Sequence, residues 1–358
     1  MVPTAIDTLW YVSARARDNG RDTRRLADSL EYGLVIRRAA RGSDSLTRGG
    51  DSLTRDGDFL TRDADVTPID SVRLTASAFA SALRSRAESR DDSLTVLYVH
   101  GFGTSLHEAW EHAAQSSVRS RSSAPWVVFC WPSNGSGVAW PRAGEFLVRA
   151  YRQDSAAAVA SRAAFSQAVR ALLPAVGGAN LVVVAHSLGS QLVGEAIAGD
   201  SVLRAALATD PLRALAFFAP DVESRRFNEL VLPAVLPLTR RIVVYASSVD
   251  RLLALSRRVN HSERAGLIRS ATQSHAGVEI VNVTNGFAAE DRLRRVFGSH
   301  HALPRASAAL FDLLQIVARR FPAECRATLG TARREAEGVW RMTAIRPPEP
   351  EAVSGCAR

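Results

Sequence analysis

A short apolar strand that turns sharply into a helix is the feature that most constrains how this chain can fold. Residues 181–184 read Leu-Val-Val-Val, an uninterrupted apolar run that is typical of a strand buried on both faces of a parallel sheet. Ser187 lies at the turn that follows, between Ala185 and Gly189, in the pattern Ala-His-Ser-Leu-Gly. Beyond the turn the pattern becomes helical, and one side of the expected helix carries Leu192, Val193, Ala196 and Ile197.

The small residues around Ser187 suit a serine that acts as a nucleophile. Such a hydroxyl must project from a tight, strained turn, and small neighbours let the strand and the helix pass close together. The N-terminus of the helix adds its dipole and free N–H groups beside the hydroxyl. An ordinary buried strand followed by a helix, with Ser187 as the helix N-cap, explains the same residues equally well. The turn alone therefore leaves both interpretations open.

The size and charge of the chain exclude some classes of function. A chain of 358 residues with 46% apolar residues can form one large α/β domain or two small ones. The net charge of +9 comes with 45 basic residues, all of them arginine and scattered through every segment. A nucleic-acid surface would need a basic cluster with interleaved aromatic residues, and the sequence has none. We therefore predict no nucleic-acid partner.

The cysteines and the N-terminus indicate the compartment. Cys130, Cys325 and Cys356 are widely spaced and odd in number, which argues against a disulfide framework and against a zinc motif. No basic region followed by an apolar one opens the chain, so no signal peptide is expected. No apolar run approaches the roughly 20 residues that span a bilayer. We predict a cytoplasmic protein without a transmembrane segment, and the sequence implies no metal, no organic cofactor and no particular oligomeric state.

Residues 1–93 precede the regular alternation of strands and helices. Residues 8–13 and 30–36 read as edge strands, and residues 70–88 as a helix. Between them, residues 41–65 repeat the phrase Asp-Ser-Leu-Thr-Arg, with small variations, every seven residues. The glycines and the single apolar residue per repeat disagree with a coiled coil, so we predict a polar, flexible insertion.

Residues 94–320 read as one α/β core. Strands are expected at residues 94–99, 126–131, 181–184, 215–219, 242–246 and 278–283, and helices at residues 145–173 and 304–320. This alternation predicts a mostly parallel sheet flanked by helices on both faces. Residues 321–358 are expected to hold a C-terminal helix and then, from residue 347, a disordered tail that is rich in proline.

A catalytic constellation follows from the ends of these strands, because such sheets hold their functional groups at the carboxyl ends. Ser187, Asp250 and His300 each follow a strand, and their order along the chain is that of the α/β-hydrolase triad. In such a triad the histidine takes the serine proton, and the carboxylate fixes the histidine tautomer. The backbone N–H groups of Phe102 and Leu188 are the expected oxyanion hole.

Each member of the constellation also has a structural interpretation. His100 precedes the oxyanion loop and is better explained as a buried structural histidine, and His186 as one that packs between strands. Asp221 follows a strand as Asp250 does, and we interpret it as a helix N-cap while keeping it as the alternative acid. Asp250 could itself be a cap, and His301 is the alternative to His300 as base.

Several motifs together resemble a bacterial α/β-hydrolase family of unknown function that is described as esterase- and lipase-like. The matching segments are Val-His-Gly-Phe-Gly-Thr-Ser at 99–105, Trp-Pro-Ser-x-Gly at 131–135, Y-x-x-D-x-x-x-A-x-x-S at 151–161, Ala-His-Ser-Leu-Gly at 185–189, Ala-Pro-Asp at 219–221, Tyr-Ala-Ser-Ser-Val-Asp at 245–250, and His300 twelve residues before Asp312. Two departures are Gly103, where the family usually has Asn, and Ala302-Leu303, where it has an aromatic pair.

The resemblance covers residues 8–317 apart from the insertion, and it implies the α/β-hydrolase fold. It implies a serine hydrolase that cleaves carboxylic esters of small molecules through an acyl-serine intermediate, with Ser187, Asp250 and His300 as the triad. A thioesterase or amidase with the same triad, or a binding or scaffold protein derived from a hydrolase, remains the alternative. The short connection between residues 219 and 242 leaves little room for a cap, so we expect an open cleft.

Overall fold

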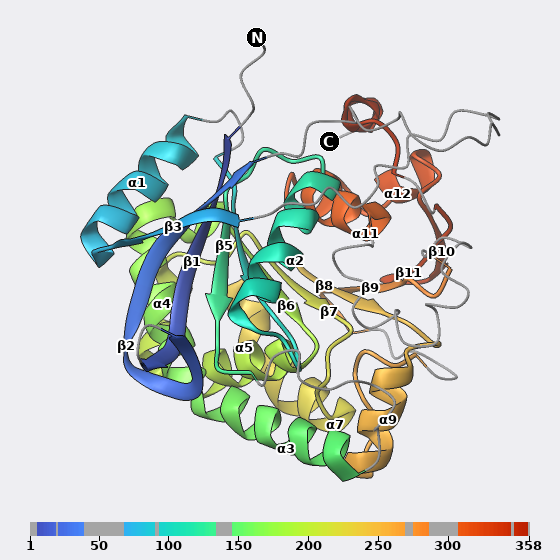
Figure 1. Cartoon of the computed structure of the whole chain (residues 1–358). Coiled ribbons are helices and arrows are strands. Elements are labelled where there is room, and N and C mark those ends of the chain that lie inside the picture. The colour runs from blue at the N-terminus through green and yellow to red at the C-terminus, as the bar shows by residue number, and fades with distance from the viewer. Residues whose placement is uncertain are drawn as a thin grey trace, which may run out of the picture.

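A twisted sheet crosses the whole molecule (Figure 1). The computed structural model describes residues 6–18, 21–38, 68–89, 93–133, 145–268, 275–285, 307–344 and 347–356. Within these ranges the sheet has eleven strands in the order β10-β11-β9-β8-β7-β6-β4-β5-β1-β2-β3. The strands are β1 (Ile6–Asp18), β2 (Arg21–Arg38), β3 (Pro68–Leu74), β4 (Thr95–Val99), β5 (Trp126–Cys130), β6 (Leu181–His186), β7 (Ala214–Phe218), β8 (Ile242–Ala246), β9 (Val278–Asn282), β10 (Ala332–Ala336) and β11 (Val339–Met342).

The centre of the sheet is parallel, and antiparallel pairs occur only at its two edges among the described strands. Parallel ladders join β1 to β5, β5 to β4, β4 to β6, β6 to β7, β7 to β8, β8 to β9 and β9 to β11. Antiparallel ladders join β1 to β2, β2 to β3 and β10 to β11. The predicted mostly parallel sheet is therefore confirmed, and β6, which leads into Ser187, lies between β4 and β7 near its middle.

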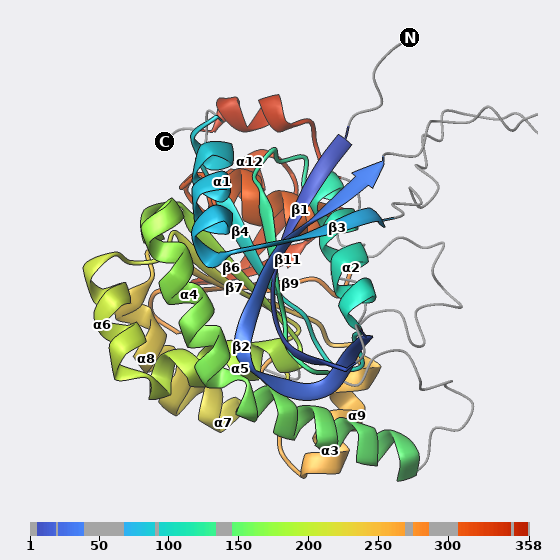
Figure 2. The same ribbon diagram turned by 60° about the vertical axis from the view of Figure 1, so that its left-hand side comes forward.

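The helices cover both faces of the sheet, as predicted. They are α1 (Ala76–Glu88), α2 (Leu106–Arg119), α3 (Glu145–Ala160), α4 (Arg162–Val176), α5 (Leu188–Gly199), α6 (Ser201–Thr209), α7 (Ser224–Arg226), α8 (Leu232–Val235), α9 (Arg251–Asn260), α11 (Ser307–Phe311) and α12 (Cys325–Thr328). Helices α1 and α4 lie on one side of the sheet and α2 on the other (Figure 2). Two π-helical stretches, Phe227–Val231 and Asp312–Val317, continue α7 and α11.

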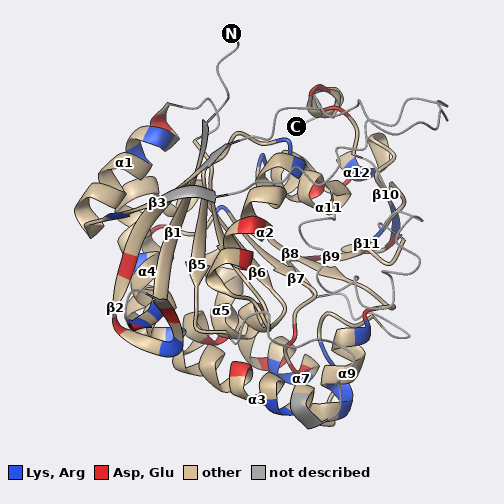
Figure 3. Ribbon diagram, in the orientation of Figure 1, with Lys and Arg blue, Asp and Glu red and all other residues tan. Residues whose placement is uncertain are grey.

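Two apolar cores result from the alternation of side chains along each strand. In β4, Leu97 and Val99 pack into one core, while Val96 and Tyr98 pack into the other. Strands β4 to β8 carry no Asp, Glu, Lys or Arg, and the charged residues are interspersed around them at the periphery (Figure 3). A strand covered on both faces must be apolar throughout, which is why the run at residues 181–184 is uninterrupted.

Two predicted helices differ in the structure. The helix expected at residues 70–88 begins only at Ala76, because β3 (Pro68–Leu74) occupies the start of that segment and pairs with β2. Thr75 caps the helix, and its hydroxyl accepts a hydrogen bond of 3.2 Å from the N–H of Ala78. The long helix expected at residues 145–173 is two helices, α3 and α4, that meet at Ser161.

The C-terminal part corrects three predictions. The strand expected to be the last is followed by β10 and β11, which extend the sheet beyond β9. Instead of a disordered tail, Pro350–Gly355 form a 3-10 helix. Cys325 and Cys356 form a disulfide with a Cα–Cα distance of 5.5 Å, which the odd number of cysteines did not suggest. Cys356 and Val353 are buried against Phe311 and Phe321, so the disulfide closes a small third core.

Three of the predictions concern residues that the structure does not describe. The repeats at residues 41–65 and both candidate bases, His300 and His301, lie outside the described residues. Among the described helices, none combines the length and the apolar character that crossing a membrane requires.

Candidate active site

The turn after β6 has the strain that a nucleophilic serine requires. Ser187 has φ 54° and ψ −122°, a combination that residues with a Cβ rarely adopt. Its backbone is tied to two neighbouring segments, since the N–H donates to Phe218 O at 3.0 Å and the carbonyl accepts from Asp221 N at 3.2 Å. Ser187 holds the N-cap position of α5, but its side chain makes no capping hydrogen bond to that helix.

Two glycines let the loop after β4 pass directly against this turn. A Cβ on Gly189 would lie 2.5 Å from His100 O and 2.8 Å from Val99 O, so any larger residue would push the helix off the loop. A Cβ on Gly101 would lie 2.8 Å from the Cβ of Ser187. Gly189, two residues after Ser187, is therefore small for the steric reason that the sequence pattern indicated.

His100 is a structural histidine at the start of this loop. It is fully buried, and its ring stacks on Trp131 with centroids 5.1 Å apart and an interplanar angle of 8°. Its Nδ1 lies 3.1 Å from Gly101 O. Burial lowers the pKa of His100 well below its usual value, and the nearby Arg15 guanidinium lowers it further. A histidine held neutral and away from solvent in this way fits the predicted structural role.

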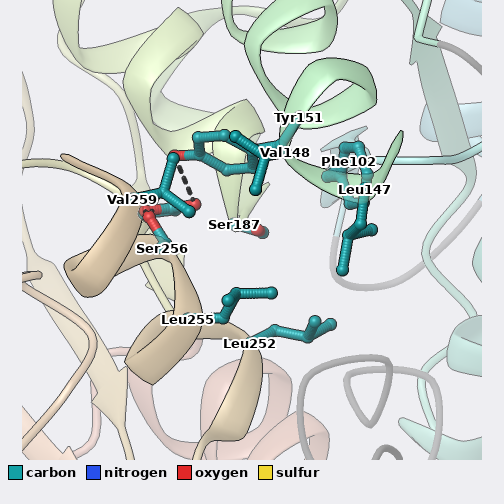
Figure 4. A pocket seen from close by; sticks show the side chains of 10 residues that line it. Phe102, Leu147, Val148, Tyr151, Ser187, Leu252, Leu255, Ser256 and Val259 are labelled. Atoms are coloured by element: carbon teal, nitrogen blue, oxygen red, sulfur yellow. Dashed lines mark hydrogen bonds between the residues drawn. The ribbon is translucent and has the colours of Figure 1, made fainter. Parts of the chain in front are cut away.

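An apolar pocket opens above Ser187 (Figure 4). It contains about 380 Å³ of space not filled by atoms, part of which is open to solvent. Aliphatic side chains from α3 and α9 face each other across it, with Ser187 between the two helices; they are Leu147, Val148, Leu252, Leu255 and Val259. Phe102, Tyr151, Asp221 and Ser256 complete the lining. The lining is therefore mostly apolar, and Ser187 is part of it.

Asp221 lies at the end of β7 and is engaged by three side chains. One carboxylate oxygen accepts the Tyr151 hydroxyl at 3.0 Å, and the other accepts the Ser256 hydroxyl at 2.6 Å and lies 3.5 Å from Arg264 Nε. The carboxylate is 3% exposed. Asp221 is not a helix cap, because Glu223 holds the N-cap position of α7. Our interpretation of Asp221 as a cap is therefore wrong.

Asp250 lies at the end of β8 and caps α9. Its Oδ1 accepts a hydrogen bond of 2.9 Å from the N–H of Leu253, and the residue is 1% exposed. The cap interpretation is thus confirmed for Asp250. One oxygen of Asp250 therefore serves the helix.

The sequence missed the residues that surround Asp221. Tyr151, Ser256 and Arg264 come from segments far apart in the chain, and all three contact its carboxylate. Of the three, only Tyr151 belongs to a motif quoted above, and that motif says nothing about what its side chain touches. Within the described part of the chain, no cluster of three or more His, Cys, Asp or Glu side chains could hold a metal ion.

Solved structures similar to this chain are distant. A protein described as a predicted CIB-like hydrolase from Thermoplasma acidophilum is 12% identical, with 87% of this chain and all of that chain covered and a TM-score of 0.34. A fungal esterase from Rhizomucor miehei is 13% identical, with 88% and 85% covered and a TM-score of 0.35. An arylesterase is 12% identical, with 87% and 86% covered and a TM-score of 0.32. Similarities this low say nothing about what the chain acts on.

The family model is more informative. No curated protein sequence matches the chain. A model described as an alpha/beta hydrolase of unknown function (DUF900) matches residues 75–305, which run from the cap of α1 past β9 and include the Ser187 turn, the loop at residues 100–104 and Asp250. With the parallel sheet and the strained turn in place, the chain belongs to this family of alpha/beta hydrolases of unknown function.

Proposed function

We propose that the protein is a serine hydrolase that cleaves carboxylic esters through an acyl-serine intermediate. The observation that carries this proposal is the strained backbone of Ser187 at the floor of an apolar pocket. Strain of this kind costs of order 1–3 kcal/mol, so it persists only where the surrounding structure enforces it. Such strained residues cluster at active sites. Ser187 is the nucleophile, Asp250 the orienting acid and His300 the base.

The reaction follows from these roles. His300 takes the proton of the Ser187 hydroxyl as its oxygen attacks the ester carbonyl carbon, and the carbonyl oxygen becomes an oxyanion. The carbon–oxygen bond to the alcohol then breaks, and the alcohol leaves with the proton from the histidine. Water attacks the acyl-serine in the same way, which releases the carboxylic acid and restores Ser187. Asp250 holds the histidine in the correct tautomer throughout.

We propose Asp250 rather than Asp221 as the acid, as the resemblance to the family's motifs implies. Both oxygens of Asp221 already accept hydroxyl groups, from Tyr151 and from Ser256. Asp250 gives one oxygen to the cap of α9, and it follows β8, two strands from β6. Asp221 is already enclosed by Tyr151, Ser256 and Arg264, which leaves its carboxylate a structural role in our proposal.

The loop after β4 supports Phe102 as an oxyanion donor. The N–H groups of the two residues that follow, Gly103 and Thr104, donate to the side chains of Asp154 and Ser133. Within the described residues, the N–H of Phe102 has no protein acceptor. The N–H of Leu188, the first residue of α5, is the second donor that we propose, since it directly follows the nucleophile.

The pocket lining supports an ester with an aliphatic chain. The opposed Leu and Val side chains of α3 and α9 offer apolar contact and few polar partners. We therefore propose small-molecule carboxylic esters whose acyl group is a hydrocarbon chain. A charged or strongly polar acyl group would lose its hydration there without gaining hydrogen bonds.

The experiment is a panel of p-nitrophenyl esters with acyl chains from two to twelve carbons, together with a matched thioester and a matched anilide. We expect hydrolysis of the esters, higher kcat/KM for chains longer than acetate, and loss of activity to background in Ser187→Ala. Folded protein that hydrolyses the thioester or the anilide much faster than the ester would overturn the choice of carboxylic ester. Activity that survives in Ser187→Ala would overturn the nucleophile.

The acid is tested by a matched pair of variants. Asp250→Asn should lower kcat by about 10⁴-fold, as expected when the tautomer of the base is no longer held. Asp221→Asn should lower it far less. The reverse order would make Asp221 the acid.

A further inference from the structure

The loop between β4 and α2 is held by side chains that the proposed chemistry does not use. Asp154 accepts the N–H of Gly103 at 2.8 Å, and Ser133 Oγ accepts the N–H of Thr104 at 3.1 Å. The two acceptors are also joined to each other, because the Ser133 hydroxyl donates to the same Asp154 oxygen at 2.5 Å. Two successive N–H groups directly after Phe102 are thus fixed by one small network.

A buried arginine from strand β1 also contacts this loop and the segment that follows β5, through a backbone carbonyl group of each. Arg15 comes from β1, and its guanidinium donates to Thr104 O at 2.7 Å and to Ser133 O at 3.1 Å. It is 6% exposed, and burial lowers its pKa from the usual value. Trp131 holds the start of the loop in turn, since its Nε1 donates to His100 O at 2.8 Å.

The members of this network come from three separate parts of the fold. Arg15 lies on β1, Ser133 follows β5, and Asp154 is on α3, the helix that also forms one wall of the pocket. All three are buried, with exposed fractions of 6%, 0% and 2%. Burying two charged groups at one short loop carries a desolvation cost that apolar packing would avoid. We attribute this desolvation cost to a need to hold the loop in one position, because the hydrogen bonds of the buried groups fix its backbone.

We propose that Arg15, Ser133 and Asp154 are positioning residues that clamp residues 100–104 so that the N–H of Phe102 faces the oxyanion formed at Ser187. This inference rests on the proposed function. Among the described residues the clamp leaves the Phe102 N–H without a protein acceptor, directly beside Gly101, which packs against Ser187. An oxyanion donor contributes about 10²–10³ in kcat, and a misplacement of about 1 Å can cost 10²-fold, so a loosened clamp should act on kcat.

The test uses three variants of the full-length protein. Ser133→Ala removes the acceptor of Thr104 N–H and the donor to Asp154, and Asp154→Ala removes the acceptor of Gly103 N–H. Ser161→Ala is the matched control, because Ser161 is fully buried and, among the described residues, its hydroxyl bonds only to Ala157 O of α3, at 2.7 Å. Asp154→Asn, which keeps an acceptor oxygen, is the conservative variant.

Two measurements separate positioning from general stability. Amide hydrogen exchange of Gly103 and Thr104 reports whether the loop is held, and it does not depend on catalysis. Ester kinetics report whether holding it matters. We expect Ser133→Ala and Asp154→Ala to speed exchange at these two amides and to lower kcat about 10–100-fold with KM changed less than about threefold. Asp154→Asn should recover part of the kcat, and Ser161→Ala should change neither readout.

Each other outcome overturns a defined part of the inference. Rapid exchange of Gly103 and Thr104 in the unmodified protein would show that no clamp exists, whatever the protein catalyses. Faster exchange in Ser133→Ala with unchanged kcat would show that the clamp does not position the oxyanion donor. A protein that hydrolyses no ester and does not react at Ser187 would overturn the proposed function and the catalytic role of the clamp, while the exchange data would still decide whether the loop is held.

Discussion

The turn at Ser187 and the ion pair of Arg326 with Asp312, near the C-terminal edge of the sheet, are both buried, yet they are built in opposite ways. At the turn, backbone segments touch directly, and Gly189 and Gly101 are required because a single Cβ would collide with a backbone oxygen or with Ser187. At the edge, long charged side chains fill the space between elements, around Arg326, which is 0% exposed. The first kind of packing fixes backbone positions to fractions of an ångström, and the second holds separate elements together.

The charged cluster near this edge joins Arg326, Asp312 and Glu279. Arg326 donates to both oxygens of Asp312, at 2.6 and 3.0 Å, and also bonds to Glu279 on β9. Asp312 accepts the Tyr245 hydroxyl at 2.7 Å. The Arg326 guanidinium lies 5.5 Å from the ring centre of Trp340 on β11. Burial alone would lower the pKa of Arg326, but Asp312 and Glu279 outweigh burial and raise it. The buried charge of Arg326 is therefore stabilised by the carboxylates of Asp312 and Glu279.

The largest expected effect is a loss of stability, caused by a substitution in this charged cluster that leaves the active site unchanged. Arg326→Met should lower the free energy of unfolding by about 3–5 kcal/mol, because Asp312 is left as a buried charge without its arginine. At a temperature where the variant is folded, kcat should stay within about twofold of the unmodified protein. Urea denaturation and ester kinetics on the same samples measure both quantities.

The double variant Arg326→Met with Asp312→Leu is the control for the uncompensated charge. It removes both members of the pair, so we expect it to be more stable than Arg326→Met alone. A single variant that costs less than about 1 kcal/mol would contradict the view that the charged cluster holds this edge.

The next effect is on the turn. Gly189→Ala should lower the free energy of unfolding by about 1–3 kcal/mol and remove most activity, because the new Cβ pushes α5 away from His100 O and moves Ser187. Gly199→Ala is the control in the same helix, since a Cβ there meets no atom within 4 Å. It should be neutral or slightly stabilising. Equal activity of the two variants would mean that close packing at the turn is not required.

The smallest expected effect is a pH dependence of the free energy of unfolding, which arises from His100 beside the turn. The pKa of His100 is lowered in the folded protein, so the unfolded chain binds a proton more readily. The stability that His100 contributes is therefore fully present above the pKa of a histidine in the unfolded chain, about 6.5. As the pH falls below that value, the free energy of unfolding decreases by about 1.4 kcal/mol per pH unit, until the pKa of His100 in the folded protein is reached. His100→Gln should reduce the slope of unfolding free energy against pH between about 6.5 and 5.

The exposed His107 provides the control for this slope. Its side chain is 58% exposed and lies 3.2 Å from Glu111, so His107→Gln should leave most of the slope in place. Urea denaturation at several pH values measures the slope for both variants. An unchanged slope in His100→Gln would show that His100 is not the group that titrates.

The same comparison explains what could be predicted from the sequence. The turn leaves a local signature, because its apolar run, its serine and its glycine lie within ten residues of one another. The capping box of α2 is equally local, because its reciprocal bonds join Ser105 and Glu108, which are three residues apart. The parallel order of the central strands followed from the alternation of strands and helices.

The edge could not be predicted in this way, because its contacts join distant residues. Arg326 and Glu279 are 47 positions apart, and Cys325 and Cys356 are 31 apart, so no local pattern marks either pair. The partners of Asp221 were missed for the same reason. The triad assignment is a prediction of another kind, since it depends on His300, which lies outside the described residues.

The central claim, that Ser187 is an activated nucleophile, is tested most directly with a fluorophosphonate followed by mass spectrometry of the digested protein. We predict one adduct per chain, on the peptide that contains Ser187. The adduct should be absent in Ser187→Ala and in heat-denatured protein, and it should form much more slowly in Asp250→Asn. Well-folded protein that gives no adduct, or that carries the adduct on another residue, would contradict the claim.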